Sequence, residues 1–270
     1  MKLHLLNRIK ILFILIILVA LSSNVFAQRV KSLNLRNADQ VPYHFGFQLG
    51  VNRMFFSLKT NPGFQKRMYY NTVFGSEGKD AVPDLNLDSA NLFGIESNPT
   101  YGFVIGIIAD MKLWQYFNIR FTPSLTFGER DLIYNIQAFS GTAAPQLLVA
   151  KKNIQSTFVE FPLSFKFKGS RINNTRPYVL VGAKYALDLA SNAKKKEDSN
   201  IVHVFIDRND VYAHLGVGFD FYTAYFKFGT EVVMSYGILD LIKRDHTIYT
   251  DAISSMQSKI FQINFTFEGD

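Results

Sequence analysis

The strongest constraint in this 270-residue sequence is a two-residue alternation of apolar and polar side chains. In residues 43–52, Tyr43, Phe45, Phe47 and Leu49 alternate with smaller or more polar residues. Successive side chains of a β-strand point to opposite faces, so such a segment predicts a strand with one apolar face. The pattern occurs in eight segments: 43–52, 101–112, 117–128, 157–168, 177–187, 211–221, 224–236 and 258–268.

The length and spacing of these segments favour a membrane barrel. A membrane-spanning strand needs about 9–11 residues, whereas the average strand of a soluble domain has about 5–6. The connections alternate between long (53–100, 129–156, 188–210 and 237–257) and short (113–116, 169–176 and 222–223). Bacterial barrels place long loops outside the cell and short turns in the periplasm. The sequence therefore predicts an all-β fold, an antiparallel transmembrane β-barrel of about eight strands over residues 43–270.

The two faces of the predicted strands differ in polarity. One face is dense in Phe and Ile and is expected to contact lipid, while charged residues are confined to the other face. A soluble β-barrel for a lipophilic ligand, the inverted alternative, would place the apolar face inside. An eight-stranded barrel has an interior just wide enough for side chains, so the inward charges predict an ion-paired plug and not a conduit. These residues are Asp110, Arg120, Glu160, Lys166, Lys184, Lys227 and Glu231.

The N-terminal residues predict export. Lys2, Arg8 and Lys10 precede an apolar run over 11–21, and Val25-Phe26-Ala27 suits cleavage by signal peptidase after Ala27. The run is too short to span a membrane core of about 30 Å comfortably, so a cleaved signal peptide at 1–27 is preferred to an uncleaved anchor. Residues 28–42 would then form a short periplasmic segment before the barrel.

Composition excludes several classes of function. The chain has no cysteine, which removes disulfides, thiolate chemistry and a lipoprotein anchor. Residues 1–27 hold three of the 29 basic residues and none of the 22 acidic ones, so the remaining chain has 26 basic residues and a net charge of +4. This mild charge does not indicate a nucleic-acid partner. We also find no phosphate-binding loop and no dinucleotide-binding glycine motif, and hence predict no cofactor and no small-molecule substrate.

Two groups of residues have the composition of a catalytic or metal site, and for both we prefer a structural role. His44 and His214 are the strand histidines, and the predicted topology places them near opposite ends of the barrel, so we expect lumen packing and no enzyme activity. Asp84, Asn86 and Asp88 have the spacing of a calcium loop, but Ser89 and Ile95 occupy the positions that need Gly and Glu. A polar surface loop is the preferred interpretation, and no metal site is predicted.

Aromatic residues near the strand ends predict girdles at the two membrane interfaces. These residues are Tyr43, Tyr101, Trp114, Tyr116, Tyr178, Tyr212, Tyr222 and Tyr225. Pro123, which cannot donate a backbone hydrogen bond, is expected to weaken its strand locally.

Several segments resemble the PorT (also SprT) family of outer-membrane barrels from Bacteroidetes. The similar segments are Tyr43-His44-Phe45-Gly46-Phe47 with Leu49-Gly50-Val51-Asn52, Val159-Glu160-Phe161-Pro162-Leu163, and Arg176-Pro177-Tyr178-Val179-Leu180-Val181-Gly182. The resemblance covers about residues 40–268. It implies an outer-membrane component of type IX protein secretion, the route that exports gliding adhesins or proteases. It brings no catalytic residues, and the ending Phe267-Glu268-Gly269-Asp270 departs from the terminal aromatic common in barrels.

The sequence thus predicts a non-enzymatic component of a secretion apparatus, with outer-membrane lipids and other secretion proteins as partners. A narrow barrel cannot pass a folded protein, so such a role would depend on loops and rim, and residues 53–100 are the preferred docking surface. The alternative is a stand-alone surface barrel for adhesion or envelope integrity, which shares all these features.

Overall fold

The computed structural model describes residues 32–70, 88–141, 144–190, 204–244 and 248–269, and residues 34–269 within these ranges belong to one compact unit. The predicted signal peptide lies outside the described residues. The elements are β1 (Tyr43–Thr60), η1 (Phe64–Lys66), β2 (Met68–Tyr70), β3 (Ser89–Lys112), β4 (Phe117–Phe121), β5 (Ser124–Phe139), β6 (Gln146–Lys168), β7 (Thr175–Asp188), β8 (Asn209–Tyr222), β9 (Lys227–Gly237), α4 (Ile248–Asp251) and β10 (Ile253–Glu268).

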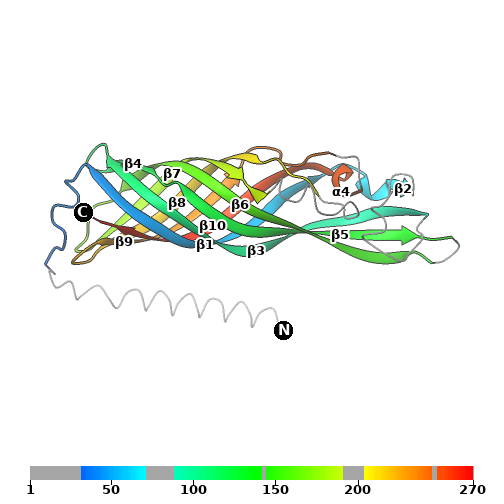
Figure 1. The fold of residues 1–270 in the computed structure, drawn as a ribbon, viewed down its shortest axis with the longest axis horizontal. Helices are drawn as coiled ribbons and strands as arrows, with labels where there is room; N and C mark the ends of the chain where they lie inside the picture. Colours follow the sequence, from blue (N-terminus) through cyan, green and yellow to red (C-terminus); the bar gives the residue numbers. More distant parts are fainter. Residues whose placement is uncertain (1–31, 71–87, 142–143, 191–203, 245–247, 270) are drawn as a thin grey trace, which may run out of the picture. The chain divides into compact units, whose positions relative to one another are not determined.

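The strands form one antiparallel sheet that closes into a ring, because β1 pairs with β10 on one side and with β3 on the other. Of the ten strands, β2 pairs only with β3 among the described residues, and β4 and β5 follow one another along a single path between β3 and β6. Eight strand paths therefore form the wall, as the eight alternating segments predicted (Figure 1).

The polarity of the two faces is that of a membrane barrel. Outward residues of β1 such as Phe45, Phe47 and Val51 are half or more exposed, whereas the inward His44 and Gln48 are buried. Outward aromatic rings stack across strands, as Phe47 does on Phe267 with ring centroids 4.8 Å apart. The apolar side chains thus form a continuous outer belt that hydrocarbon can cover, and the inverted arrangement of a soluble ligand-binding barrel is wrong for this chain.

Several strands are much longer than the sequence analysis predicted. β3 has 24 residues and β6 has 23, and both continue past the ring on the side of β2 and α4 (Figure 1). The connections predicted over 53–100 and 129–156 are therefore wrong in part, because 53–60, 68–70, 89–100, 129–139 and 146–156 belong to strands. The connection predicted over 237–257 is wrong at its end, because 253–257 belong to β10. Three short turns at the other end are confirmed, but only 113–116 has the predicted bounds. The predicted turn 169–176 is 169–174 in the structure, and the predicted turn 222–223 is 223–226.

The extensions were missed because the apolar residues change face along the strands. On β5 the apolar side chains Leu125 and Phe127 point outward, but farther along the strand Leu132, Tyr134 and Ile136 point inward and are buried. On the side of β2 and α4, the strands that extend past the ring therefore enclose an apolar core, as in a soluble sheet protein. We call this part of the protein the cap. The cap core consists of Phe56, Tyr69, Ala90, Leu92, Leu132, Tyr134, Ile136, Ala150, Ile154, Val204, Ile206, Leu241, Ile242, Ile248, Tyr249, Ala252, Ile253 and Met256.

Pro123 interrupts the wall where the sequence predicted a weakness. β4 ends at Phe121 and β5 begins at Ser124, while the carbonyl of Pro123 still accepts a hydrogen bond from the amide of Ile107. The ring is thus closed through the break by β3. In the part of the chain that the structure describes, no helix has the length and apolar character to cross a membrane.

Candidate functional site

We call the half of the lumen near the short turns the lower half, and the half near the cap the upper half. A charge network around Arg120 fills the lower half. Its guanidinium contacts Asp110 at 2.9 Å, Glu268 at 2.5 Å and Glu231 at 3.4 Å. Lys227 makes a second ion pair with Glu268 at 2.5 Å. All five side chains are buried, and buried charges are tolerated only when they are paired and hydrogen-bonded. The network therefore fills the barrel as a plug.

Tyr178 and Lys166 extend the network across the lumen. The hydroxyl of Tyr178 donates to Glu231 at 3.0 Å, and the ammonium of Lys166 lies 3.9 Å from the centre of the Tyr178 ring and 2.7 Å from Asp220. Gly218 pairs with Tyr178 across β7 and β8 and leaves room for the ring, because a Cβ at Gly218 would lie 2.5 Å from the Tyr178 Cζ atom.

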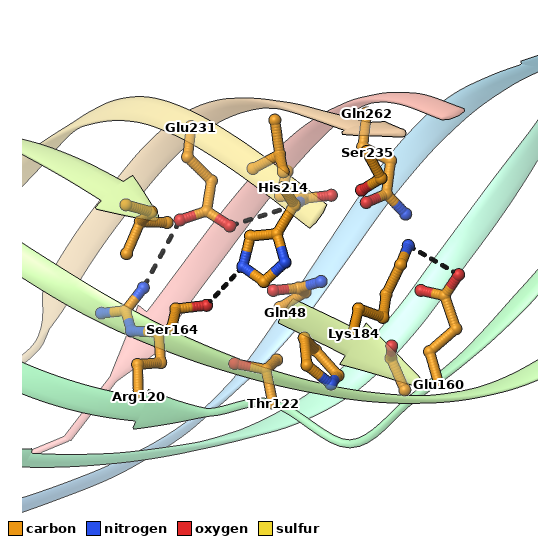
Figure 2. A pocket seen from close by; sticks show the side chains of 15 residues that line it. Gln48, Arg120, Thr122, Glu160, Ser164, Lys184, His214, Glu231, Ser235 and Gln262 are labelled. Atoms are coloured by element: carbon orange, nitrogen blue, oxygen red, sulfur yellow. Dashed lines mark hydrogen bonds and ion pairs between the residues drawn. The ribbon is translucent and has the colours of Figure 1, made fainter. Parts of the chain in front are cut away.

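Above Arg120 lies a cavity of about 40 Å³, which Figure 2 shows from close by. His214 and Ser164 both line it and are hydrogen-bonded to each other, with 2.7 Å between Nε2 and Oγ. The Nδ1 atom of His214, Ser235 Oγ and Gln262 Nε2 have no hydrogen-bond partner among the described residues. Such buried polar atoms are normally satisfied by water, and the volume suits about three water molecules. The cavity is too small for an organic substrate.

An ion pair and an arginine occupy the lumen between the cavity and the cap. Lys184 pairs with Glu160 at 2.8 Å, and its ammonium lies 4.8 Å from the ring centre of Tyr212. Above this pair, Arg130 donates to Ser258 and lies 4.2 Å from the ring centre of Phe56. Arg130 is fully buried, so it closes the lumen directly below the apolar core of the cap.

The opposite mouth is closed by the segment that precedes β1. The carboxylate of Asp39 accepts hydrogen bonds from Arg176 at 2.6 Å and from the Tyr222 hydroxyl at 2.8 Å, and Lys112 donates to its backbone carbonyl at 2.6 Å. Burial alone would raise the pKa of the Asp39 carboxyl, but the Tyr222 hydrogen bond and the charge of Arg176 outweigh it and lower the pKa. The segment is therefore held to the rim as an anion.

A family model for the outer membrane protein beta-barrel domain matches residues 26–243. The chain belongs to this family. It is an outer-membrane β-barrel protein, and the predicted fold class is confirmed. No curated protein matches the sequence.

Two solved outer-membrane proteins resemble this outer-membrane barrel in structure. OprG from Pseudomonas aeruginosa has 10% identity and a TM-score of 0.41, over 85% of this chain and 98% of OprG. Ail, the attachment invasion locus protein of Yersinia pestis, has 9% identity and a TM-score of 0.33, over 84% of this chain and 99% of Ail. That structure of Ail contains the heparin analogue sucrose octasulfate.

The charged residues predicted to point into the outer-membrane barrel all do so. Asp110, Arg120, Glu160, Lys166, Lys184, Lys227 and Glu231 are buried, and each makes an ion pair inside the lumen. Ser164, Asp220 and Glu268 are also buried in the lumen, on the polar face that the alternation predicts for their strands. Arg130 was missed, because residues 129–156 were predicted to be a connection.

The two histidines do not meet. His44 pairs with Asp110 across β1 and β3 beside the lower rim, whereas His214 lines the cavity with Ser164. Of the three residues with calcium-loop spacing, Asp84 and Asn86 lie outside the described residues. Asp88 accepts a hydrogen bond from the amide of Gly141.

The predicted aromatic girdles need a correction. Tyr43, Tyr101, Trp114, Tyr116 and Tyr225 are exposed on the outer surface of this outer-membrane barrel, as expected. Tyr178, Tyr212 and Tyr222 are buried and belong to the lumen, so their assignment to a girdle was wrong. Their place in the alternation explains this, because the outward positions of β7 and β8 are held by residues such as Val179 and Phe221.

Proposed function

We propose that this outer-membrane barrel is a non-enzymatic accessory component of type IX protein secretion that acts through its surfaces. The observation that carries the proposal is the filled lumen. Arg120 and its partners fill the lower half, Arg130 and the cap core close the upper end, and Asp39 secures a segment at the other mouth. Because side chains of the described residues fill the lumen, the two rims and the cap are left as the surfaces on which the protein acts.

The cavity also argues against an enzyme. A Ser-His-acid mechanism needs a carboxylate on the second ring nitrogen of the histidine and room for a substrate. The Nδ1 atom of His214 has no hydrogen-bond partner among the described residues, and the cavity has about 40 Å³. We therefore assign the Ser164–His214 contact to packing of the lumen.

The cap offers a docking surface of a specific kind. From 146 to 156, β6 pairs with β5 and has no second strand neighbour among the described residues. Leu147 and Val149 on this stretch are each 69% exposed. An open strand edge with exposed apolar residues is suited to pairing with an extended segment of another chain. We propose this edge for contact with other secretion components, in place of the loop expected over residues 53–100.

The assignment to type IX secretion, and to the PorT family within the outer-membrane barrels, is supported by the resemblance of the segments around Tyr43, Val159 and Arg176. A deletion strain should lose export of type IX cargo, measured as cargo in the culture medium. Normal export from that strain would contradict the secretion role and would favour the stand-alone barrel for adhesion or envelope integrity.

Complementation tests the docking edge separately. The double variant Leu147→Lys/Val149→Lys should insert into the membrane but fail to restore export, because two charges now occupy the open edge. The matched control, Asn135→Lys/Gln137→Lys, adds the same charges to the neighbouring strand β5 on the paired residues of the same face, and it should restore export. Equal complementation by both variants would remove the edge from the proposal.

A further inference from the structure

Two cations lie side by side on the outer surface of the barrel, each beside a tyrosine. Arg53 on β1 pairs with Tyr101 on β3, and Lys259 on β10 pairs with Tyr236 on β9. The guanidinium carbon of Arg53 lies 5.8 Å from the Tyr101 ring centre, and the ammonium of Lys259 lies 4.7 Å from that of Tyr236. The four residues thus occupy four neighbouring strands in the order β9, β10, β1 and β3.

The cations are diagonal neighbours in the sheet. Arg53 faces Phe261 across β1 and β10, and Lys259 faces Phe55 two residues farther along. Diagonal residues on one face of an antiparallel pair lie about 7–8 Å apart, within reach of long side chains. In the structure Arg53 leans toward Tyr101 on β3 and Lys259 leans toward Tyr236 on β9. Both side chains are long enough to turn toward each other, and in that arrangement one anion contacts both cationic groups.

Their height on the wall is that of a membrane interface. The next outward residues toward the periplasmic turns are apolar and exposed, namely Val51, Phe103, Met234 and Phe261. Arg53 and Lys259 are the first charged outward residues met along β1 and β10 on the way to the cap. The long connections and the cap define the extracellular side of a bacterial barrel, so the cations lie at the headgroups of the outer leaflet. Tyrosines are favoured at the same level.

Within the described part of the chain, no carboxylate neutralises this pair. Among the described residues, neither Arg53 nor Lys259 has an acidic group within ion-pair distance, although the buried cations of the lumen are paired. The outward Glu129 lies on β5, beyond Tyr101, and accepts hydrogen bonds from Asn153 and Gln155. The two charges are therefore available to an external anion.

We propose that Arg53 and Lys259 form a binding site for the phosphate group of a phosphorylated outer-leaflet lipid. Arginine contacts two phosphate oxygens through its planar fork, and lysine supplies a point charge to a third oxygen. The apolar belt below holds the acyl chains of the same lipid, so one molecule satisfies both surfaces. The site is independent of the secretion role, because it concerns the membrane around the barrel.

The test uses the full-length protein purified in nonionic detergent. Bis-phosphorylated lipid A, the same lipid after enzymatic dephosphorylation, and inorganic phosphate are added in parallel. Lipid binding is measured by native mass spectrometry and by the shift in the unfolding midpoint. The wild type should prefer the phosphorylated lipid, and Arg53→Gln/Lys259→Gln should bind it at least tenfold more weakly, equivalent to about 1.4 kcal/mol.

The control variant Lys59→Gln/Lys66→Gln removes two exposed positive charges from the same side of the barrel and should bind like the wild type. Electrophoretic mobility without heating checks that every variant is folded. Equal affinity of the wild type and Arg53→Gln/Lys259→Gln for the phosphorylated lipid would overturn the proposal. Equal protection by inorganic phosphate at the same concentration would overturn the lipid assignment and leave a site for free phosphate.

Discussion

Replacement of Arg120 by Gln tests whether the charge network is the main element that holds the lower lumen together. The guanidinium is the ion-pair partner of Asp110 and Glu231 and shares Glu268 with Lys227. Its removal leaves two buried carboxylates without their ion pair. One of these two carboxylates can be neutralised by taking up a proton. At pH 7, about three pH units above the ordinary pKa of a carboxyl, protonation costs about 4 kcal/mol, because each pH unit corresponds to about 1.4 kcal/mol. This agrees with the roughly 3–5 kcal/mol for breaking a buried ion pair.

The same reasoning gives a pH dependence. The folded variant binds a proton that the unfolded chain releases at neutral pH, so the stability of the variant relative to the wild type rises as the pH falls. Between pH 7 and pH 5 the deficit should shrink by about 2.7 kcal/mol. The measurement is urea unfolding of the refolded barrel in detergent micelles, followed by circular dichroism at several pH values.

Lys59→Gln is the control for this experiment, because Lys59 is exposed and has no ion pair among the described residues. It should unfold like the wild type at every pH. A deficit of Arg120→Gln below about 1 kcal/mol at pH 7, or one that does not change with pH, would refute the view that these carboxylates depend on Arg120.

Three further variants test other parts of the structure. Asp39→Asn should loosen the segment before β1, which is measured as faster hydrogen exchange of its backbone amides. In the wild type the same loosening should begin only when the pH falls toward the lowered pKa of Asp39, because a lowered pKa gives stability that is lost when the carboxylate is protonated. Gly218→Ala should cost about 1–3 kcal/mol in urea unfolding, because the added Cβ meets the Tyr178 ring and the backbone, and an unchanged midpoint would contradict this contact. Leu132→Ala should cost about 2–5 kcal/mol and make the cap sensitive to protease before the ring, whereas loss of both together would show that the cap is not a separate unit.

The sequence predicted the ring well because lipid and lumen impose opposite polarity on alternate residues. That single rule was enough to place Arg120, Lys166 and Glu231 inside and Phe45 outside. Tyr178 shows the limit of a composition argument, because an aromatic residue near a strand end fits a girdle or a lumen equally well. Only its position in the alternation decides, and that position is inward.

The cap and the site details could not be predicted in the same way. Leu132 and Ile136 interrupt the alternation expected for a membrane strand, so the segment was interpreted as a loop although it is regular β-structure. The Ser164–His214 contact depends on the register between β6, β7 and β8, which the sequence alone does not determine. Arg53 and Lys259 become neighbours only when the first and last strands close the ring.

The exchange of apolar residues from the outside to the inside of β5 fixes how deep the protein sits. Sliding the molecule by two residues along a strand, about 7 Å, would carry Arg53 and Lys259 into hydrocarbon or lift Val51 and Phe261 into water. The cap cannot offset the free-energy cost of either displacement, because its core side chains are already buried away from both water and lipid. In a bilayer thicker or thinner than the belt, the lipids must therefore stretch or compress around a protein that stays at one level.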